Sequence, residues 1–162
     1  MQKLILSIDQ GTTSSRSVLF NTLGKKIFSS QYEFKQIFPN SGWVEHDPKE
    51  IWKVTLKTIR ESIKKSKSLK SKIISIGIAN QRETTILWNK VTGNPVYNAI
   101  VWQDRRTQNI CESLKKRKLE NFFRKKTGLF IDPYFSATKV KWILDKVSIA
   151  KKLLKSKQLM FG

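Results

Sequence analysis

The chain has 162 residues, with 32 Lys and Arg against 12 Asp and Glu, and a formal net charge of +20. This length suits one domain or part of one, and a hydrophobic share of 39% with nine Phe and five Trp excludes a wholly disordered basic tail. The charge is typical of proteins that bind nucleic acid or anionic membranes. However, 25 of the 32 cations are lysine, whereas arginine is favoured for bidentate contacts with phosphates and bases. A lysine-rich, solvated surface is the alternative interpretation.

Cysteine content and hydropathy indicate in which cellular compartment the chain is expected. Cys111 is the single cysteine, so an intrachain disulfide or a metal site built on several cysteines is excluded, and we expect a reducing, cytoplasmic location. The first apolar run, residues 4–8, ends at Asp9 and is too short for a signal peptide. No run approaches 18 apolar residues, so no membrane span is expected.

The first 36 residues predict three strands. Residues 3–9 form an apolar run typical of a strand that is buried on both faces. Two further strands are expected at residues 16–20 and 26–34, after a small polar turn and a turn containing Gly24. Because both turns are short, the three strands should form an antiparallel meander.

A helix and a parallel strand follow. Residues 47–50 read Asp-Pro-Lys-Glu, which places an N-cap carboxylate, a proline at the first helical position and a glutamate at the third. An apolar stripe then recurs at spacings of four, three and four, formed by Trp52, Leu56, Ile59 and Ile63. The apolar run 73–79 predicts another buried strand, and a helix between two such strands predicts a crossover that makes the strand parallel to the first.

The remaining residues are mostly helical in pattern. Two short strands are expected at residues 84–88 and 98–102, joined by the turn 89–95. Helices are expected at residues 105–119, 120–126 and 137–147, with Gly128 ending the second of them. The apolar residues 159–162 have no cap and are typical of an element that is cut short.

Asp9-Gln10-Gly11-Thr12-Thr13-Ser14-Ser15-Arg16 is the first constellation with chemical meaning. A carboxylate at the end of a strand meets a turn rich in N–H and hydroxyl donors, which is the composition of an anion-binding concavity. Gly11 lets the backbone approach a ligand closely, and Arg16 offers a fork for phosphate. Asp9 can hold Mg²⁺ through water. An ordinary polar hairpin is the alternative.

Arg82 and Glu83 directly follow the run 73–79. The carboxyl ends of parallel strands are where open α/β sheets place their ligands. Arg82 can donate to hydroxyl oxygens and Glu83 can accept hydroxyl protons, a combination that suits a polyol. A local ion pair in a loop is the alternative.

Two aromatic residues lie next to rigid or polar turns. Trp102 can wall a pocket or pack in the core, and Asp104, two residues on, is positioned to cap the following helix. Tyr134 follows an Asp-Pro step and can direct its hydroxyl to a ligand, or pack with that hydroxyl in solvent. His46 has no serine or cysteine partner in the pattern and is interpreted as structural.

Together these segments carry a resemblance. The residues 9–16 (DQGTTSSR), in a strand-turn-strand setting, resemble the actin/hexokinase/Hsp70 ATPase fold, which has an α/β, ribonuclease H-like core with a mixed sheet and flanking helices. GWVEHDP (42–48), NQRETT (80–85), NAIVWQDRR (98–106) and TGLFIDPYFSATK (127–139) resemble the glycerol kinases, within the FGGY carbohydrate kinases.

The resemblance implies ATP-dependent phosphorylation of glycerol to sn-glycerol 3-phosphate, with ATP and Mg²⁺ as cofactors. By it, the nucleotide phosphates are bound by Gly11, Thr12, Thr13, Ser14 and Arg16. Asp9 lies near Mg²⁺. The glycerol hydroxyls are bound by Arg82, Glu83 and Tyr134, and Trp102 packs on the carbon chain.

The same resemblance marks a departure. Members of the family are several times longer, and their catalytic base, adenine site and second, C-terminal actin-like domain lie beyond the positions that residue 162 matches. We therefore expect residues 1–162 to form a partial FGGY-type N-terminal domain that is truncated and inactive alone, with the missing C-terminal half or further copies as partners. The alternatives are a fragment of another FGGY sugar kinase and a basic nucleic-acid-binding remnant of the kinase fold. We expect no specific nucleic-acid partner.

Overall fold

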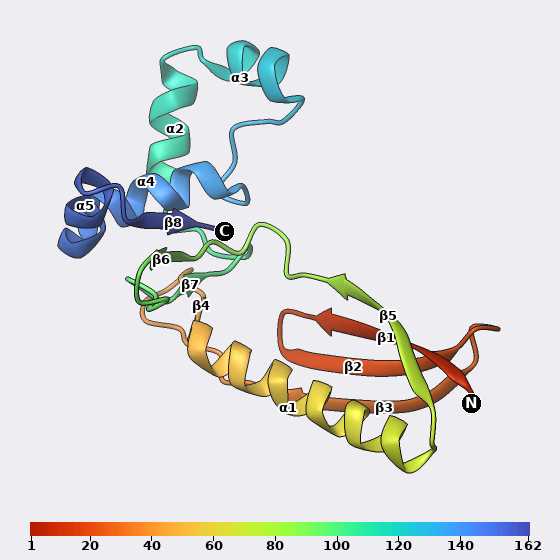
Figure 1. The fold of residues 1–162 in the computed structure, drawn as a ribbon. Helices are drawn as coiled ribbons and strands as arrows, with labels where there is room; N and C mark the ends of the chain where they lie inside the picture. The colour runs from red at the N-terminus through yellow and green to blue at the C-terminus, as the bar shows by residue number, and fades with distance from the viewer. The chain divides into compact units, whose positions relative to one another are not determined.

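The computed structural model describes residues 1–162, which form two compact units. The first contains Met1–Gln36 and Asp47–Gln81, and the second contains Ile37–His46 and Arg82–Gly162. These are called unit 1 and unit 2 (Figure 1).

Unit 1 is built on a four-stranded mixed sheet. Its strands are β1 (Lys3–Gln10), β2 (Ser14–Asn21), β3 (Lys26–Glu33) and β5 (Lys72–Ala79). They lie in the order β3-β2-β1-β5. β2 pairs antiparallel with both β1 and β3, and β5 pairs parallel with β1. The predicted meander and the predicted parallel crossover are both confirmed.

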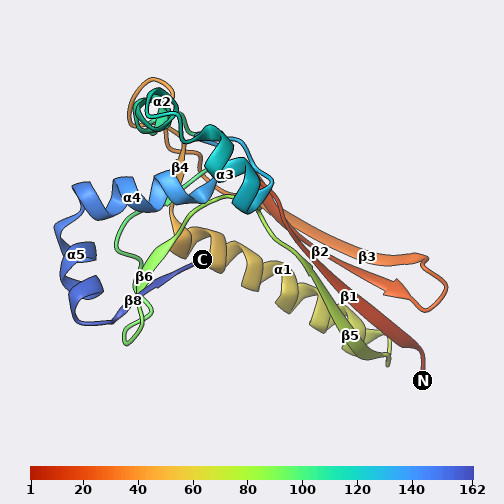
Figure 2. The same ribbon diagram turned by 90° about the horizontal axis from the view of Figure 1, so that it is seen from above.

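The crossover helix α1 (Pro48–Ser68) runs along this sheet (Figure 2). Its start is as predicted, because the Asp47 carboxylate accepts a hydrogen bond from the Lys49 N–H at 2.9 Å and Pro48 occupies the first turn. The Glu50 carboxylate accepts from the Lys35 N–H at 3.4 Å, so it faces the strand connection.

The buried face of α1 is not the one that the apolar spacing predicts. Trp52 is 61% exposed and Ile63 is 38% exposed, so the expectation of one buried stripe is wrong for both. The residues that α1 buries are all small and polar, namely Thr55, Thr58, Ser62 and Ser66.

Hydroxyl groups explain why this polar face is stable when buried. The Ser15 and Thr55 hydroxyls are 2.9 Å apart. The Ser17 hydroxyl donates to the Thr58 carbonyl at 2.7 Å and lies 2.6 Å from the Ser62 hydroxyl. Small side chains let the helix approach the sheet closely, and their mutual hydrogen bonds remove the penalty of burying polar atoms.

Strand β5 also departs from its prediction. The run was expected to be buried, but Ile74, Ile76 and Ile78 are exposed by 47%, 58% and 73%. β5 is the edge strand of the sheet, and Ile73 is its only residue that is not exposed. That core contains Leu4, Leu6, Ile8 and Leu19, with Ile59 and Ile73 packed against it.

Unit 2 combines two short two-stranded antiparallel sheets with four helices. β4 (Glu45–His46) pairs antiparallel with β7 (Ala99–Ile100), and β6 (Leu87–Asn89) pairs antiparallel with β8 (Leu159–Phe161). The helices are α2 (Gln108–Lys116), α3 (Glu120–Thr127), α4 (Ser136–Lys146) and α5 (Ser148–Lys155). Leu87, Ile100, Ile143 and Ala150 form a core that β6, β7, α4 and α5 share.

The predicted elements of unit 2 are present with shifted bounds. α2 is shorter than the expected 105–119, and Gly128 ends α3 in the left-handed conformation, with φ of 75°, as predicted. β4 and α5 were not predicted, and residues 159–161 form the paired strand β8. No helix is long and apolar enough to span a bilayer.

The hydroxyl contacts of α1 lead to a stability prediction. Ser17→Ala should lower the free energy of unfolding by about 1–3 kcal/mol, because it leaves buried groups of α1 without a partner. Urea unfolding followed by circular dichroism measures this loss. Ser29→Ala on exposed β3 is the matched control and should change stability by less than about 0.5 kcal/mol. Equal effects of the two substitutions would contradict a structural role for the polar interface.

Candidate functional site

The donor-rich turn joins β1 to β2 in unit 1. The Gly11 N–H donates to the Ser14 carbonyl at 3.0 Å, which closes the turn. A Cβ at residue 11 would lie 3.2 Å from that carbonyl oxygen, closer than ordinary van der Waals contact. A side chain at this position would have to displace the carbonyl slightly, so glycine favours the tight turn.

Neighbouring segments of unit 1 hold the turn in place. The Gln81 side-chain amide donates to the Gly11 carbonyl at 2.8 Å, and the Phe34 N–H donates to the Thr13 carbonyl at 3.2 Å. Gln31 donates to the Ser14 hydroxyl at 2.9 Å. Because Gln81 follows β5, this contact ties the turn to the parallel strand beside it.

Asp9 and Arg16 face each other across the two strands that flank the turn. They are register partners in the β1–β2 pairing, and the Arg16 guanidinium lies 2.6 Å from the Asp9 carboxylate. Their side chains are 41% and 47% exposed, so both can exchange this pairing for a ligand.

The residues present fit Mg²⁺ only in a limited sense. No group of three or more His, Cys, Asp or Glu side chains is placed to hold a metal ion. Mg²⁺ keeps several waters and is often held by one carboxylate together with substrate phosphates. Asp9 alone, partly exposed at the end of β1, meets that requirement.

Glu83 occupies a constrained position at the start of unit 2. Its φ of 61° is in the left-handed region, which is uncommon for a residue with a side chain. Its carboxylate accepts hydrogen bonds from the N–H of Ser136 at 3.2 Å and from the hydroxyl of Ser136 at 3.0 Å. The first residue of α4 therefore fixes the Glu83 carboxylate, while Arg82, its neighbour in sequence, is exposed.

Lys139 connects Glu83 to the loop that carries Tyr134. Its side chain is fully buried, and its ammonium group donates to the Glu83 carbonyl at 3.0 Å and to the Tyr134 carbonyl at 2.5 Å. No pattern in the sequence singles out this residue, because a lysine in a helix of so basic a chain is typically solvated.

The two aromatic residues of the predicted polyol site are neighbours in unit 2. The rings of Trp102 and Tyr134 have centroids 5.9 Å apart and meet edge to face. The Tyr134 N–H donates to the Asp132 carboxylate at 2.8 Å, which fixes the turn after the Asp-Pro step. The structure thus gathers Glu83, Trp102 and Tyr134, and it places the donor-rich turn in the other unit.

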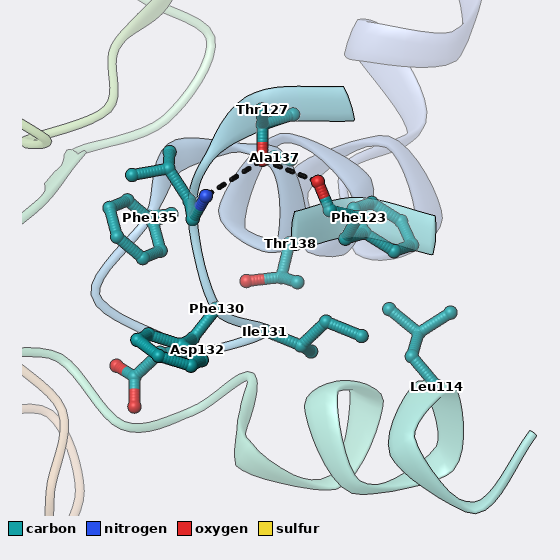
Figure 3. A pocket seen from close by; sticks show the side chains of 10 residues that line it. Leu114, Phe123, Thr127, Phe130, Ile131, Asp132, Phe135, Ala137 and Thr138 are labelled. Atoms are coloured by element: carbon teal, nitrogen blue, oxygen red, sulfur yellow. Dashed lines mark hydrogen bonds between the residues drawn. The ribbon is translucent and has the colours of Figure 1, made fainter. Parts of the chain in front are cut away.

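An apolar cavity of about 140 Å³ lies near this loop in unit 2 (Figure 3). It is lined chiefly by carbon atoms, including the side chains of Leu114, Phe123, Phe130, Ile131 and Phe135. It lacks Arg82, Glu83 and Trp102 among its lining residues. A polyol placed in it would leave most of its hydroxyls without partners, so this cavity is not the polyol site.

Arg106 is the buried charge around which unit 2 is organised. Its guanidinium is fully buried and lies 2.7 Å from the Glu45 carboxylate and 2.8 Å from the Asp104 carboxylate. It also lies over the ring of Trp43, 3.8 Å from the centroid, and 4.7 Å from the centroid of Trp142. Burial opposes the charge, but hydrogen bonds with Asp104 and Glu45 prevail and raise the pKa of Arg106 above its ordinary value.

Asp104 does not cap a helix, and that expectation is corrected. α2 begins at Gln108 and has Thr107 at its N-cap, without a side-chain capping bond. The Asp104 carboxylate instead accepts from the Val44 N–H at 2.6 Å and from Arg106. The buried ion pair with Arg106 determines the orientation of the Asp104 carboxylate, because it is stronger than a solvent-exposed capping bond.

Known proteins share the sequence of this chain along nearly its whole length. Residues 4–160 match the N-terminal domain of the FGGY family of carbohydrate kinases. The chain belongs to this family, and the expected fold class is confirmed.

Within the family, the chain is most informatively compared with glycerol kinases. It is 56% identical to the glycerol kinase of Bacillus subtilis (strain 168) over 162 residues, which are 100% of this chain and 33% of that relative. The structure of Plasmodium falciparum glycerol kinase with ADP matches 99% of this chain with a TM-score of 0.94 at 35% identity, and the match covers 32% of that protein. The gluconate kinase of Lactobacillus acidophilus matches 90% of this chain with a TM-score of 0.81 at 26% identity, over 29% of that protein. The chain is therefore glycerol kinase-like, and it spans about a third of the length of these relatives.

The Arg106 network leads to a second prediction. Arg106→Met should destabilise unit 2 by about 3–5 kcal/mol, because it leaves the carboxylates of Glu45 and Asp104 buried without a counter-charge. Arg105→Met is the matched control, since Arg105 is exposed and pairs with Asp132 at 3.2 Å; it should cost about 0–1 kcal/mol. Urea unfolding of both variants measures the difference, and similar losses would show that burial of Arg106 is not what matters.

Lys139 leads to a prediction about pH. Burial outweighs the attraction of Glu83, Asp104 and Asp132 and lowers the pKa of Lys139 from 10.5 to about 8. Between these values the unfolded chain binds the proton and the folded chain does not, so stability rises with pH. We expect a gain of up to about 3 kcal/mol between pH 7 and pH 10.5 that is absent in Lys139→Met. Unfolding of both proteins across this pH range tests it, and parallel profiles would refute it.

Proposed function

We propose that this chain supplies the phosphate-binding turn and the glycerol-binding side chains of an ATP-dependent glycerol kinase that forms sn-glycerol 3-phosphate. The observation that supports this most strongly is the arrangement of Glu83, Trp102 and Tyr134 in unit 2, in a chain that is 56% identical to a glycerol kinase along its whole length. Identity to the gluconate kinase is lower, at 26%, which favours glycerol over other sugar substrates of the family.

The chemistry of unit 2 suits a small polyol. A carboxylate that is held by Ser136 at 3.0 Å keeps further lone pairs with which to accept hydroxyl protons. The exposed Arg82 next to it can donate to hydroxyl oxygens. The face of Trp102 offers an apolar surface for the carbon chain, and the Tyr134 hydroxyl adds a donor or acceptor.

The chemistry of unit 1 suits the phosphates of ATP. Thr12, Thr13 and Ser14 offer hydroxyl and amide donors on a turn that is fixed by Gln81 at 2.8 Å from the Gly11 carbonyl. Arg16 can bind a phosphate oxygen when it leaves Asp9. Mg²⁺, carried with the nucleotide, would neutralise charge on the phosphates, with Asp9 near it through water.

A proton acceptor for the glycerol hydroxyl is the function that these residues do not supply. Asp104 is buried and paired with Arg106 at 2.8 Å, and Glu83, held by Ser136, is assigned to accepting a hydrogen bond from bound glycerol rather than to removing its proton. Asp132 accepts from the Tyr134 N–H at 2.8 Å. We therefore infer that the 162 residues bind glycerol without turning it over, and that turnover requires a carboxylate from a further polypeptide segment of the kind that the longer relatives possess.

Binding and turnover test the proposal separately. The chain should bind glycerol in saturation-transfer NMR, and Glu83→Gln should weaken that binding by roughly 10- to 150-fold, because the loss of a charged acceptor costs roughly 1.5–3 kcal/mol. Glu112→Gln on the exposed face of α2 is the matched control and should bind as the parent does.

The kinase assay completes the test. With ATP, Mg²⁺ and glycerol, the chain alone should show no turnover, and addition of the remaining two thirds of the Bacillus subtilis relative should produce sn-glycerol 3-phosphate. Absence of glycerol binding, or equal binding by the Glu83→Gln variant, would refute the assignment of Glu83. Turnover by the chain alone would refute the need for a further carboxylate.

A further inference from the structure

We propose that Lys139 is a positioning residue of the polyol site, which holds the backbone of Glu83 and the backbone of Tyr134 at a fixed separation and thereby sets the size of polyol that fits. This inference rests on the proposed function, because it concerns the residues to which glycerol binding is assigned.

The first turn of α4 contacts Glu83 through two side chains. Ser136 and Lys139 are three residues apart at the start of α4, so their side chains lie on the same side of the helix. Ser136 donates to the Glu83 carboxylate, at 3.2 Å and 3.0 Å, and Lys139 donates to the Glu83 carbonyl at 3.0 Å. One rigid element therefore fixes both the side chain and the backbone of Glu83, although the residues are 56 positions apart in sequence.

The second bond of Lys139 makes it more than a support for Glu83. The same ammonium group donates to the Tyr134 carbonyl at 2.5 Å. A single nitrogen that binds two carbonyl oxygens keeps them no farther apart than the sum of the two hydrogen-bond lengths. Glu83 and Tyr134, which come from separate loops, are therefore held by one atom.

The cost of this arrangement indicates that it is maintained for a reason. The Lys139 side chain is fully buried, and the Glu83 backbone is left-handed with φ of 61°. Strained residues of this kind persist only where their surroundings over-determine them, and they cluster at functional sites. The titratable groups that act on the ammonium are Glu83, Asp104, Asp132 and Cys111, and its hydrogen bonds to Glu83 and Tyr134 go to carbonyl oxygens rather than to a carboxylate.

Three variants separate positioning from general stability. Lys139→Met keeps the length of the side chain and removes its donors, while Lys139→Arg keeps charge and donors. Lys141→Met is the matched control, because Lys141 is exposed on the same helix and pairs only with Asp145 at 2.8 Å. All three are compared with the parent chain.

The first readout does not depend on glycerol. The amides of Thr84 and Phe135 share peptide groups with the carbonyls that Lys139 binds, so their ¹⁵N shifts should follow the titration of Lys139 with a midpoint near pH 8. The titration should disappear in Lys139→Met and persist in Lys141→Met. If the two amides of the parent chain do not titrate together, the proposal is overturned.

The second readout is selectivity. Lys139→Met should bind glycerol about tenfold more weakly than the parent chain, as is typical when the support of a binding residue is removed, and its preference for glycerol over the five-carbon polyol xylitol should narrow. Lys139→Arg should recover part of both. Unchanged affinity and preference in folded Lys139→Met would overturn the proposal.

Other results also decide. If the parent chain binds no glycerol, the proposed function fails, and the amide titration still decides whether Lys139 couples the two loops. If Lys139→Met does not fold, the selectivity of Lys139→Arg and the titration of the parent chain decide in its place: a parent-like preference in Lys139→Arg without a shared titration would refute the positioning role.

Discussion

The constraint on which unit 2 depends is the burial of one guanidinium. Arg106 lies between two carboxylates and two tryptophan rings. Trp43 and Glu45 come from residues 37–46, Asp104 lies two residues before Arg106, and Trp142 comes from α4. Glu45 belongs to a segment that precedes α1, so the network ties residues 37–46 to the rest of the unit. Taking a charge out of water costs several kcal/mol, and only a nearly complete set of partners offsets this cost. The position of Trp43, Glu45 and Asp104 is therefore determined together.

Unit 1 solves a related problem with neutral groups. Its helix meets the sheet through hydroxyls that bond to one another, as Ser17 does with Ser62 at 2.6 Å. Such a contact holds at a close approach and tolerates little change in side-chain volume. The donor-rich turn joins the ends of β1 and β2, the strands that α1 covers. The closely packed layer of helix and sheet therefore fixes the backbone at both ends of this turn. In both units, the residues assigned to ligands stand on elements whose own position is fixed by buried polar contacts.

The sequence predicts the fold where local signals and global topology agree. The Asp47-Pro48 start of α1, the Gly128 end of α3 and the strand order of the meander depend on neighbouring residues, and all are confirmed. The burial of Trp52 and of the β5 isoleucines was wrong, because spacing shows which residues share a face and not which face meets the sheet. The residues of the candidate site were predicted from the resemblance to a family. Lys139 was not predicted, because its partners are backbone carbonyls and no residue pattern reveals such contacts.

The distribution of charge in the structure bears on what the +20 net charge means. The runs Lys115–Lys118 and Arg124–Lys126 are exposed in unit 2 and contain none of the residues assigned to glycerol. The two cations with defined structural partners in the interior, Lys139 and Arg106, are fully desolvated and add nothing to a surface field. Surface lysines repel one another only weakly at physiological ionic strength, where the screening length is about 8 Å. The excess charge is thus carried by surface positions that neither the core nor the candidate site constrains. The cations that determine geometry, Lys139 and Arg106, are few and buried, and the net charge does not reveal them.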